Sequence, residues 1–103
     1  MSAMPAILGV GEADNVVVAL RRLEAGEVLA LPGGEALTVA DEIPFGHKVA
    51  SRPIAAGGDV VKYDEVIGRA TAEIPAGGHV HVHNVVSARL PGELPSYEAP
   101  ARP

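Results

Sequence analysis

Apolar and polar residues alternate along this chain in short stretches that are separated by turns rich in glycine and proline. Alternation with a period of two is typical of β-strands that bury one face, and glycine and proline are typical of the turns between strands. The pattern predicts an all-β domain with at most one or two short helices. We expect strands over residues 6–10, 27–31, 36–39, 48–51, 60–62, 67–73 and 79–83.

A short phrase occurs four times in the sequence: an aliphatic residue, two further residues, a glycine, and then an apolar stretch led by valine. Each copy is expected to end one strand, turn sharply at the glycine, which adopts positive φ without strain, and begin a new strand. The segment PGGEAL at 32–37 likewise predicts a hairpin loop. The copies are LEAGEV from Leu23, IPFGHKV from Ile43, IAAGGDVV from Ile54 and IPAGGHV from Ile74.

Residues 14–23 give conflicting signals. Asp14 is a suitable helix N-cap, and the spacing of Leu20 and Leu23 fits a helical face. Three consecutive valines at 16–18 instead favour a strand. We expect a short helix in this segment.

The end of the chain differs from the rest. Residues 90–103 contain four prolines and no periodic pattern, so we expect an extended, weakly ordered tail. With 103 residues in total, the chain has the length of a single domain. We place this domain at residues 1–90 and the proline-rich tail at 91–103.

Composition narrows the classes of function. The net charge is −5 and no basic run is longer than Arg21-Arg22, which argues against a nucleic-acid partner. The chain has no cysteine, so disulfides and thiolate sites are excluded, and this composition fits a reducing compartment. No apolar run approaches the ~20 residues of a membrane span, and the first residues lack the basic start of a signal peptide. We therefore expect a cytoplasmic protein with no membrane partner.

The segment GGHVHVHN at 77–84 carries most of the chemistry that the sequence offers. On a strand, His79, His81 and His83 would share one face, while the intervening valines would point into the core. Neighbouring histidines would lie about 7 Å apart, close enough for two imidazoles to reach one ion, but the outer two would lie about 13 Å apart. The spacing predicts a metal pair, either His79/His81 or His81/His83, completed by other ligands.

Two sources for the remaining ligands stay open. His47, which directly follows a predicted glycine turn, is a candidate third ligand, and carboxylates from a partner chain would serve equally well. The simpler alternative is a half-exposed strand whose polar face happens to be histidine. Lys62 and Tyr63 offer an amine and a phenol for binding a carboxylate or transferring a proton, or they form an ordinary solvated strand end.

Several motifs, taken in order, resemble the SAF domain of the altronate and galactarate dehydratase family, a group that includes the small subunit of sulfolactate sulfo-lyase. The resemblance extends over residues 6–90 and implies a β-clip fold, a compact all-β unit with glycine-marked corners. The chain departs from the family pattern at Asp64, where many relatives carry glycine after the Lys-Tyr pair. The motifs are DNVVVAL at 14–20, GHKVA at 46–50, VKY at 61–63, IGRA at 67–70 and GHVHVHN at 78–84.

The resemblance also implies a function. Enzymes of this family eliminate water, or sulfite, from hydroxylated acids such as altronate, galactarate or sulfolactate, and several depend on a divalent metal. We therefore expect a lyase subunit that is inactive without a large catalytic subunit, acts on a sugar acid, and uses a divalent metal such as Fe²⁺ or Mn²⁺. The alternative is a non-catalytic SAF module that docks on the large subunit or recognises a sugar acid.

The candidate site residues fall into three groups. His47, His81 and His83 are the candidate catalytic residues, and His81 and His83 are also the candidate metal ligands. The candidate substrate-binding residues are Lys48, Lys62, Tyr63, His79 and Asn84.

Overall fold

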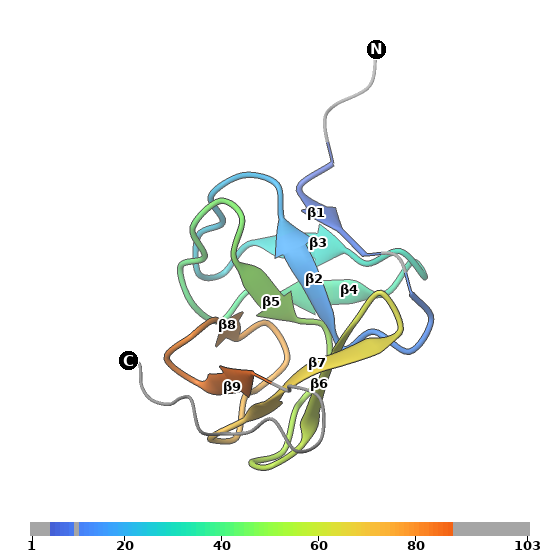
Figure 1. Ribbon diagram of the computed structural model, residues 1–103. Helices are drawn as coiled ribbons and strands as arrows, with labels where there is room; N and C mark the ends of the chain where they lie inside the picture. The colour runs from blue at the N-terminus through green and yellow to red at the C-terminus, as the bar shows by residue number, and fades with distance from the viewer. Residues whose placement is uncertain (1–4, 10, 88–103) are drawn as a thin grey trace.

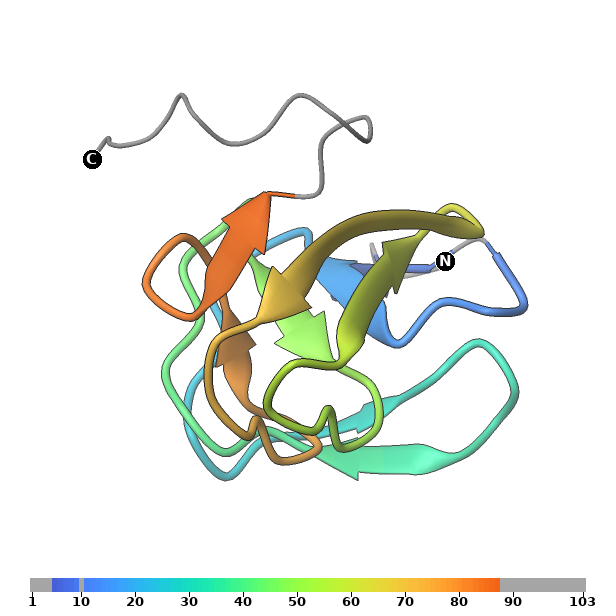
Figure 2. The same ribbon diagram turned by 60° about the horizontal axis from the view of Figure 1, so that its bottom comes forward.

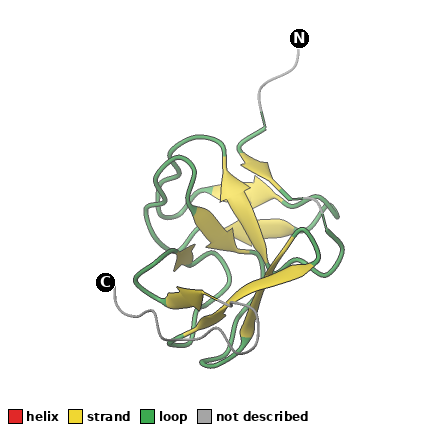
Figure 3. Cartoon of the chain, viewed as in Figure 1, coloured by secondary structure: helices red, strands yellow, loops and turns green. Residues whose placement is uncertain are grey.

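The computed structural model describes residues 5–9 and 11–87, and within these ranges the chain forms β-strands and turns but no helix (Figures 1 and 3). The all-β prediction is therefore confirmed. No helix long and apolar enough to cross a membrane occurs in this described part of the chain. The strands are β1 (Ile7–Leu8), β2 (Val16–Ala19), β3 (Val28–Ala30), β4 (Ala36–Thr38), β5 (Lys48–Ala50), β6 (Asp59–Lys62), β7 (Glu65–Ala70), β8 (His79–Val80) and β9 (Val85–Ser87).

The strands form three small antiparallel sheets. One sheet has the order β1-β2-β5-β8, a second is the hairpin β3-β4, and a third has the order β6-β7-β9. In the second view the β3-β4 hairpin lies at one side of the molecule, and β6, β7 and β9 lie in front of β5 and β8 (Figure 2). Because β5 and β8 are neighbours, the segments that contain His47 and the histidine row come together.

The four repeated phrases build the same corner, and they pair two by two. Leu23 and Ile43 form an isolated antiparallel bridge, and so do Ile54 and Ile74. The glycine at the turn has positive φ in every copy, with values of 94°, 86°, 81° and 85° at Gly26, Gly46, Gly57 and Gly77. The turn needs this left-handed backbone, which glycine adopts without steric cost.

Within residues 5–9 and 11–87, the core consists of two apolar clusters, one around each pair of phrases. Leu23 and Ile43 belong to the first cluster, and Ile54 and Ile74 belong to the second. Adjacent residues of β2 bury into different clusters, Val17 into the first and Val16 into the second. Strand β2 therefore lies between the two clusters with both of its faces covered.

This position explains why the predicted helix over 14–23 is wrong. Residues Val16–Ala19 are β2, hydrogen-bonded between β1 and β5. Asp14 does not cap a helix: its carboxylate accepts bonds from the backbone N–H groups of Gly11, at 3.0 Å, and Asp64, at 2.7 Å. A strand buried on both faces suits consecutive β-branched residues, so tertiary pairing overrode the local cap signal.

The strand predicted at 79–83 is too long, and of the two valines predicted to point into the core, only Val80 does so. Strand β8 ends at Val80, which is 1% exposed, and the chain then turns, leaving Val82 80% exposed. The hairpin predicted from PGGEAL is confirmed, because β3 and β4 pair across it. Strand β9 was missed. The predicted tail at 91–103 lies outside the described residues.

Candidate functional site

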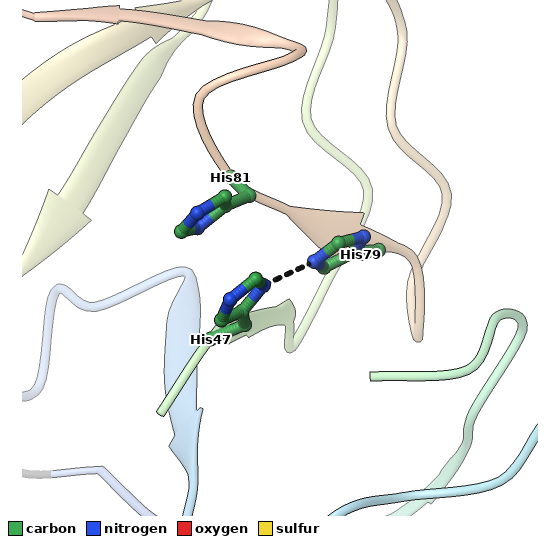
Figure 4. Close-up of side chains that lie close together, drawn as sticks. All are labelled: His47, His79 and His81. Atoms are coloured by element: carbon green, nitrogen blue, oxygen red, sulfur yellow. Dashed lines mark hydrogen bonds between the residues drawn. The ribbon is translucent and has the colours of Figure 1, made fainter. Parts of the chain in front are cut away.

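Three imidazoles gather at the end of the β5-β8 pair. His47 directly precedes β5, His79 opens β8 and His81 directly follows β8. The register pairs Val49 with His79 and Lys48 with Val80, which places the backbone of His47 opposite that of His81. One ring nitrogen from each histidine lies within 4.8 Å of the other two, and all three side chains are half-buried (Figure 4).

The three rings are stacked closely. The centroids of His47 and His81 lie 3.6 Å apart with an 8° angle between the ring planes. His47 Nδ1 and His79 Nε2 are 2.8 Å apart, a hydrogen bond in which one nitrogen carries the proton and the other accepts it. Ligand nitrogens around a tetrahedral ion lie about 3.4 Å apart, given metal–nitrogen bonds of about 2.1 Å. Because an imidazole lone pair lies in the ring plane, the stacked rings would have to tilt toward one another to bind one ion.

Backbone contacts hold the histidines in place. The His47 carbonyl accepts a bond from the Ala19 N–H at 2.8 Å, which ties the start of β5 to β2. The Asp41 carboxylate accepts a bond from the His79 N–H at 3.0 Å. Sequence reasoning missed Asp41, because it lies in a loop with no motif of its own. These contacts fix the backbone of two of the three histidines from outside the histidine row.

Asn84 holds the turn that ends β8. Its side-chain oxygen accepts a bond from the His81 N–H at 3.0 Å, and its side-chain nitrogen donates to the His79 carbonyl at 2.8 Å. The Asn84 N–H in turn donates to the His81 carbonyl at 3.1 Å. The amide of Asn84, a candidate substrate-binding group in the sequence, is thus engaged with the backbone of the residues that it positions.

Burial favours the neutral form of two imidazoles. The pKa of His79 is lowered from its ordinary value by burial first, then by the nearby imidazoles of His83, His47 and His81, with Asp41 acting in the opposite direction. The pKa of His81 is lowered by burial, then by His47, Lys48 and His83. A neutral imidazole has a free lone pair, which is the form that binds a metal.

The structure does not place the remaining candidate residues among these three imidazoles. The His83 ring is tilted by 39° against the His79 ring at a centroid distance of 4.9 Å, and the His83 side chain is exposed. The Lys62 ammonium group lies 4.4 Å above the ring of Tyr63. Tyr63 and Asp64 form the two-residue turn between β6 and β7, with φ of 56° and 62°. A two-residue hairpin turn of this kind requires positive φ at both positions, which explains why glycine suits position 64.

A pocket of about 290 Å³ adjoins the histidine group. Lys48, His81 and Ser87 provide polar groups to its lining, and aliphatic side chains from β6, β7, β8, β9 and the turn after β8 provide the rest. Burial and the positive charge of Lys62 lower the pKa of Lys48. His81 is therefore shared between the pocket and the group of three imidazoles.

These features describe a small all-β domain with a three-histidine site at the edge of a sheet. The sequence profile of the altronate/galactarate dehydratase SAF domain matches residues 5–88. The chain belongs to this SAF-domain family, which confirms the resemblance found in its motifs.

Relatives carry the domain in two contexts. The chain is 37% identical over 94 residues to altronate dehydratase of Bacillus subtilis (strain 168), a match that covers 91% of the chain but 19% of that relative. It is 38% identical over 84 residues to galactarate dehydratase (L-threo-forming) of Escherichia coli (strain K12), covering 80% of the chain and 15% of the relative. It is 41% identical over 87 residues to (2R)-sulfolactate sulfo-lyase subunit alpha of Chromohalobacter salexigens, covering 78% of the chain and 93% of that subunit. The chain thus spans under a fifth of the two dehydratases and nearly all of the sulfo-lyase subunit.

Proposed function

We propose that this chain is the small subunit of a sugar-acid hydro-lyase, in which His47, His79 and His81 hold a divalent metal and a separate large subunit completes the active site. The observation that carries the proposal is the meeting of three imidazole nitrogens within 4.8 Å of one another. The names of its relatives, altronate dehydratase and galactarate dehydratase, supply the reaction class.

The donor set of three imidazoles fits Fe²⁺ better than Mn²⁺, which prefers oxygen ligands. Imidazole is a common ligand of first-row transition metals, and three protein ligands leave positions open for substrate, as catalytic centres require. When bound, the metal would act as a Lewis acid on an oxygen of the substrate. The β5-β8 pair and its turn hold the backbone of the three histidines in place, so binding an ion requires reorientation of the rings.

The chemistry of elimination indicates what else is needed. Removing water next to a carboxylate requires a base for the α-proton and an acid for the departing hydroxide. His83 is the imidazole of the row that stays outside the group of three, so we assign proton transfer to it. We keep Lys62 and Tyr63 as substrate-binding candidates at the rim. One wall of four histidines cannot enclose a substrate, so the opposite wall has to come from a partner chain.

A second reaction is suggested by the name of another relative. The chain matches 93% of the length of (2R)-sulfolactate sulfo-lyase subunit alpha. This likeness supports, as the second candidate reaction, elimination of sulfite from a sulfonated hydroxy acid, with the same demand for a base at the α-carbon. The two reactions use the same site and differ in the leaving group.

The test is reconstitution of the chain with the product of a neighbouring large-subunit reading frame. The mixture is supplied with Fe²⁺ or Mn²⁺ and with altronate, galactarate or (2R)-sulfolactate, and formation of 2-keto acid and of sulfite is followed. We expect turnover only with both chains present, and a loss of at least about 100-fold in His79→Ala and His81→Ala. Arg22→Ala, in an exposed position, is the matched control. Full activity of the large chain alone, or normal turnover in both histidine variants, would contradict the proposal.

A further inference from the structure

A half-buried lysine stands beside the histidine group without a negative partner. Lys48 pairs with Val80 across β5 and β8, while the next pair is Val49 with His79. Because side chains alternate between the faces of a strand, Lys48 points to the face opposite His79. Among the residues that the structure describes, none forms an ion pair or a side-chain hydrogen bond with its ammonium group.

Lys48 lines the pocket of about 290 Å³ between the two larger sheets. Val60, Ile67 and Val85 form part of its aliphatic lining, and His81 lies at its boundary with the histidine group. A charge placed against aliphatic walls loses hydration, and this cost is offset only when an opposite charge is bound. The strongest attractive group in the pocket is therefore a cation, the Lys48 ammonium group.

A second cation reinforces the first. Lys62, at the end of β6, lies close enough to Lys48 for the two positive charges to repel each other. The chain as a whole carries a net charge of −5, so this local pair of positive charges is opposite in sign to the net charge. Like charges held together destabilise a fold unless an anion binds near them.

We propose that this pocket is a carboxylate subsite, in which Lys48 Nζ binds the carboxylate of a hydroxy-acid ligand and Lys62 adds long-range attraction. The remaining carbons of the ligand extend toward His81, the histidine that belongs both to the pocket lining and to the group of three. The aliphatic lining offers few partners for hydroxyl groups, so the carboxylate end enters the pocket and the hydroxylated carbons stay outside it. The inference rests on the proposed function only in taking the bound anion to be the substrate carboxylate.

The experiment uses the chain alone, without metal or partner. Valine methyl groups are isotope-labelled, and their NMR shifts are followed during titration with glycolate, the simplest hydroxy acid, and with the neutral analogue glycolamide. We expect saturable shifts at Val60, Val80, Val82 and Val85 with glycolate, and none with glycolamide. Higher salt should weaken glycolate binding, because the attraction is electrostatic.

Variants then test whether Lys48 supplies the positive charge that binds glycolate. Lys48→Met keeps the aliphatic stem and should weaken glycolate binding by about tenfold or more. Lys48→Arg, which keeps the charge, should retain most of the binding. Arg22→Met removes the same charge from an exposed residue near Glu24 and Glu42, and should change the affinity by less than about twofold.

Three outcomes would overturn the subsite: no saturable shift in the unaltered chain, shifts confined to valines outside the pocket, or equal affinity in Lys48→Met. The first two do not depend on whether any variant folds. Metal binding by His47, His79 and His81 is measured separately in the same samples. Loss of the carboxylate subsite with an intact metal site would reject this inference and leave the proposed function standing.

Discussion

Gly77 and Gly57 occupy equivalent positions in two copies of the repeated phrase, and the structure predicts very different costs for replacing them by alanine. Both have positive φ, 85° and 81°. A methyl group on Gly57 would have open space around it. A methyl group on Gly77 would overlap the carbonyl oxygen of Thr38 and would lie 3.1 Å from the N–H nitrogen of Ala40.

The difference can be worked out from these surroundings. The left-handed backbone costs about 1–2 kcal/mol for alanine at either position. At Gly77 the overlap adds about 1–3 kcal/mol of the kind seen in overpacked sites. Moving the segment also strains the bonds from the Gly77 N–H to Ala50, at 2.7 Å, and from the Ala40 N–H to Gly77, at 2.9 Å, each worth about 1 kcal/mol. We expect losses of about 3–5 kcal/mol in Gly77→Ala and about 1–2 kcal/mol in Gly57→Ala.

Urea unfolding followed by circular dichroism measures both free energies of unfolding, and thermal unfolding gives a second reading. The two variants should differ by about 10–20 °C in Tm, since each kcal/mol shifts the Tm of a domain of this size by about 4–8 °C. Gly57→Ala is the control for the backbone term, because it changes φ preference without an overlap. Free energies of unfolding that agree within about 1 kcal/mol would refute the reasoning.

Three further predictions concern the histidine site. Titration with Co²⁺, followed by its visible absorption, should show one ion per chain, with affinity reduced by at least about tenfold in His79→Ala and His81→Ala but by less than about threefold in His83→Ala; a dominant effect of His83→Ala would place the metal on the other pair. Asn84→Ala should lower the free energy of unfolding by about 1–2 kcal/mol, because it leaves the His81 N–H and the His79 carbonyl without their partner, and should also weaken Co²⁺ binding; stability equal to that of the unaltered chain in urea would contradict this. Folding lowers the pKa values of His79 and His81 from 6.5, so the metal-free folded state binds fewer protons than the unfolded state just below pH 6.5. The free energy of unfolding should therefore fall as the pH drops through that window. A Tm that is equally high at pH 5 and pH 7.5, or a pH dependence that persists unchanged in a His79→Gln/His81→Gln variant, would count against this prediction.

The all-β class could be predicted because the signals that specify it are local. Period-two alternation and the glycine turns act within a few residues, and the four repeated phrases all form the predicted corner. The hairpin at PGGEAL follows from the same local logic. Which phrase pairs with which could not be predicted, because bridges such as Leu23 with Ile43 depend on burial in a shared cluster.

Strand β2 shows where local signals conflict. Asp14 and the leucine spacing favoured a helix, and the valines favoured a strand, by similar amounts. Two apolar clusters, one on each face of β2, stabilise the strand, and no local sequence pattern indicates them. The Asp14 carboxylate is used instead to join the 11–14 loop to the β6-β7 turn.

For the site, the sequence by itself determined which residues are the candidates and set a geometric limit. Histidines spaced by two along a strand cannot all reach one ion, so a third ligand had to come from elsewhere, and His47 was one of the sources left open. Only the tertiary structure brought His47 to His79, 32 residues away, and ended β8 early enough for His81 to join them. The physical reason is that strand register is a non-local property: it is set by hydrogen bonds and burial between segments that meet only after the chain has folded.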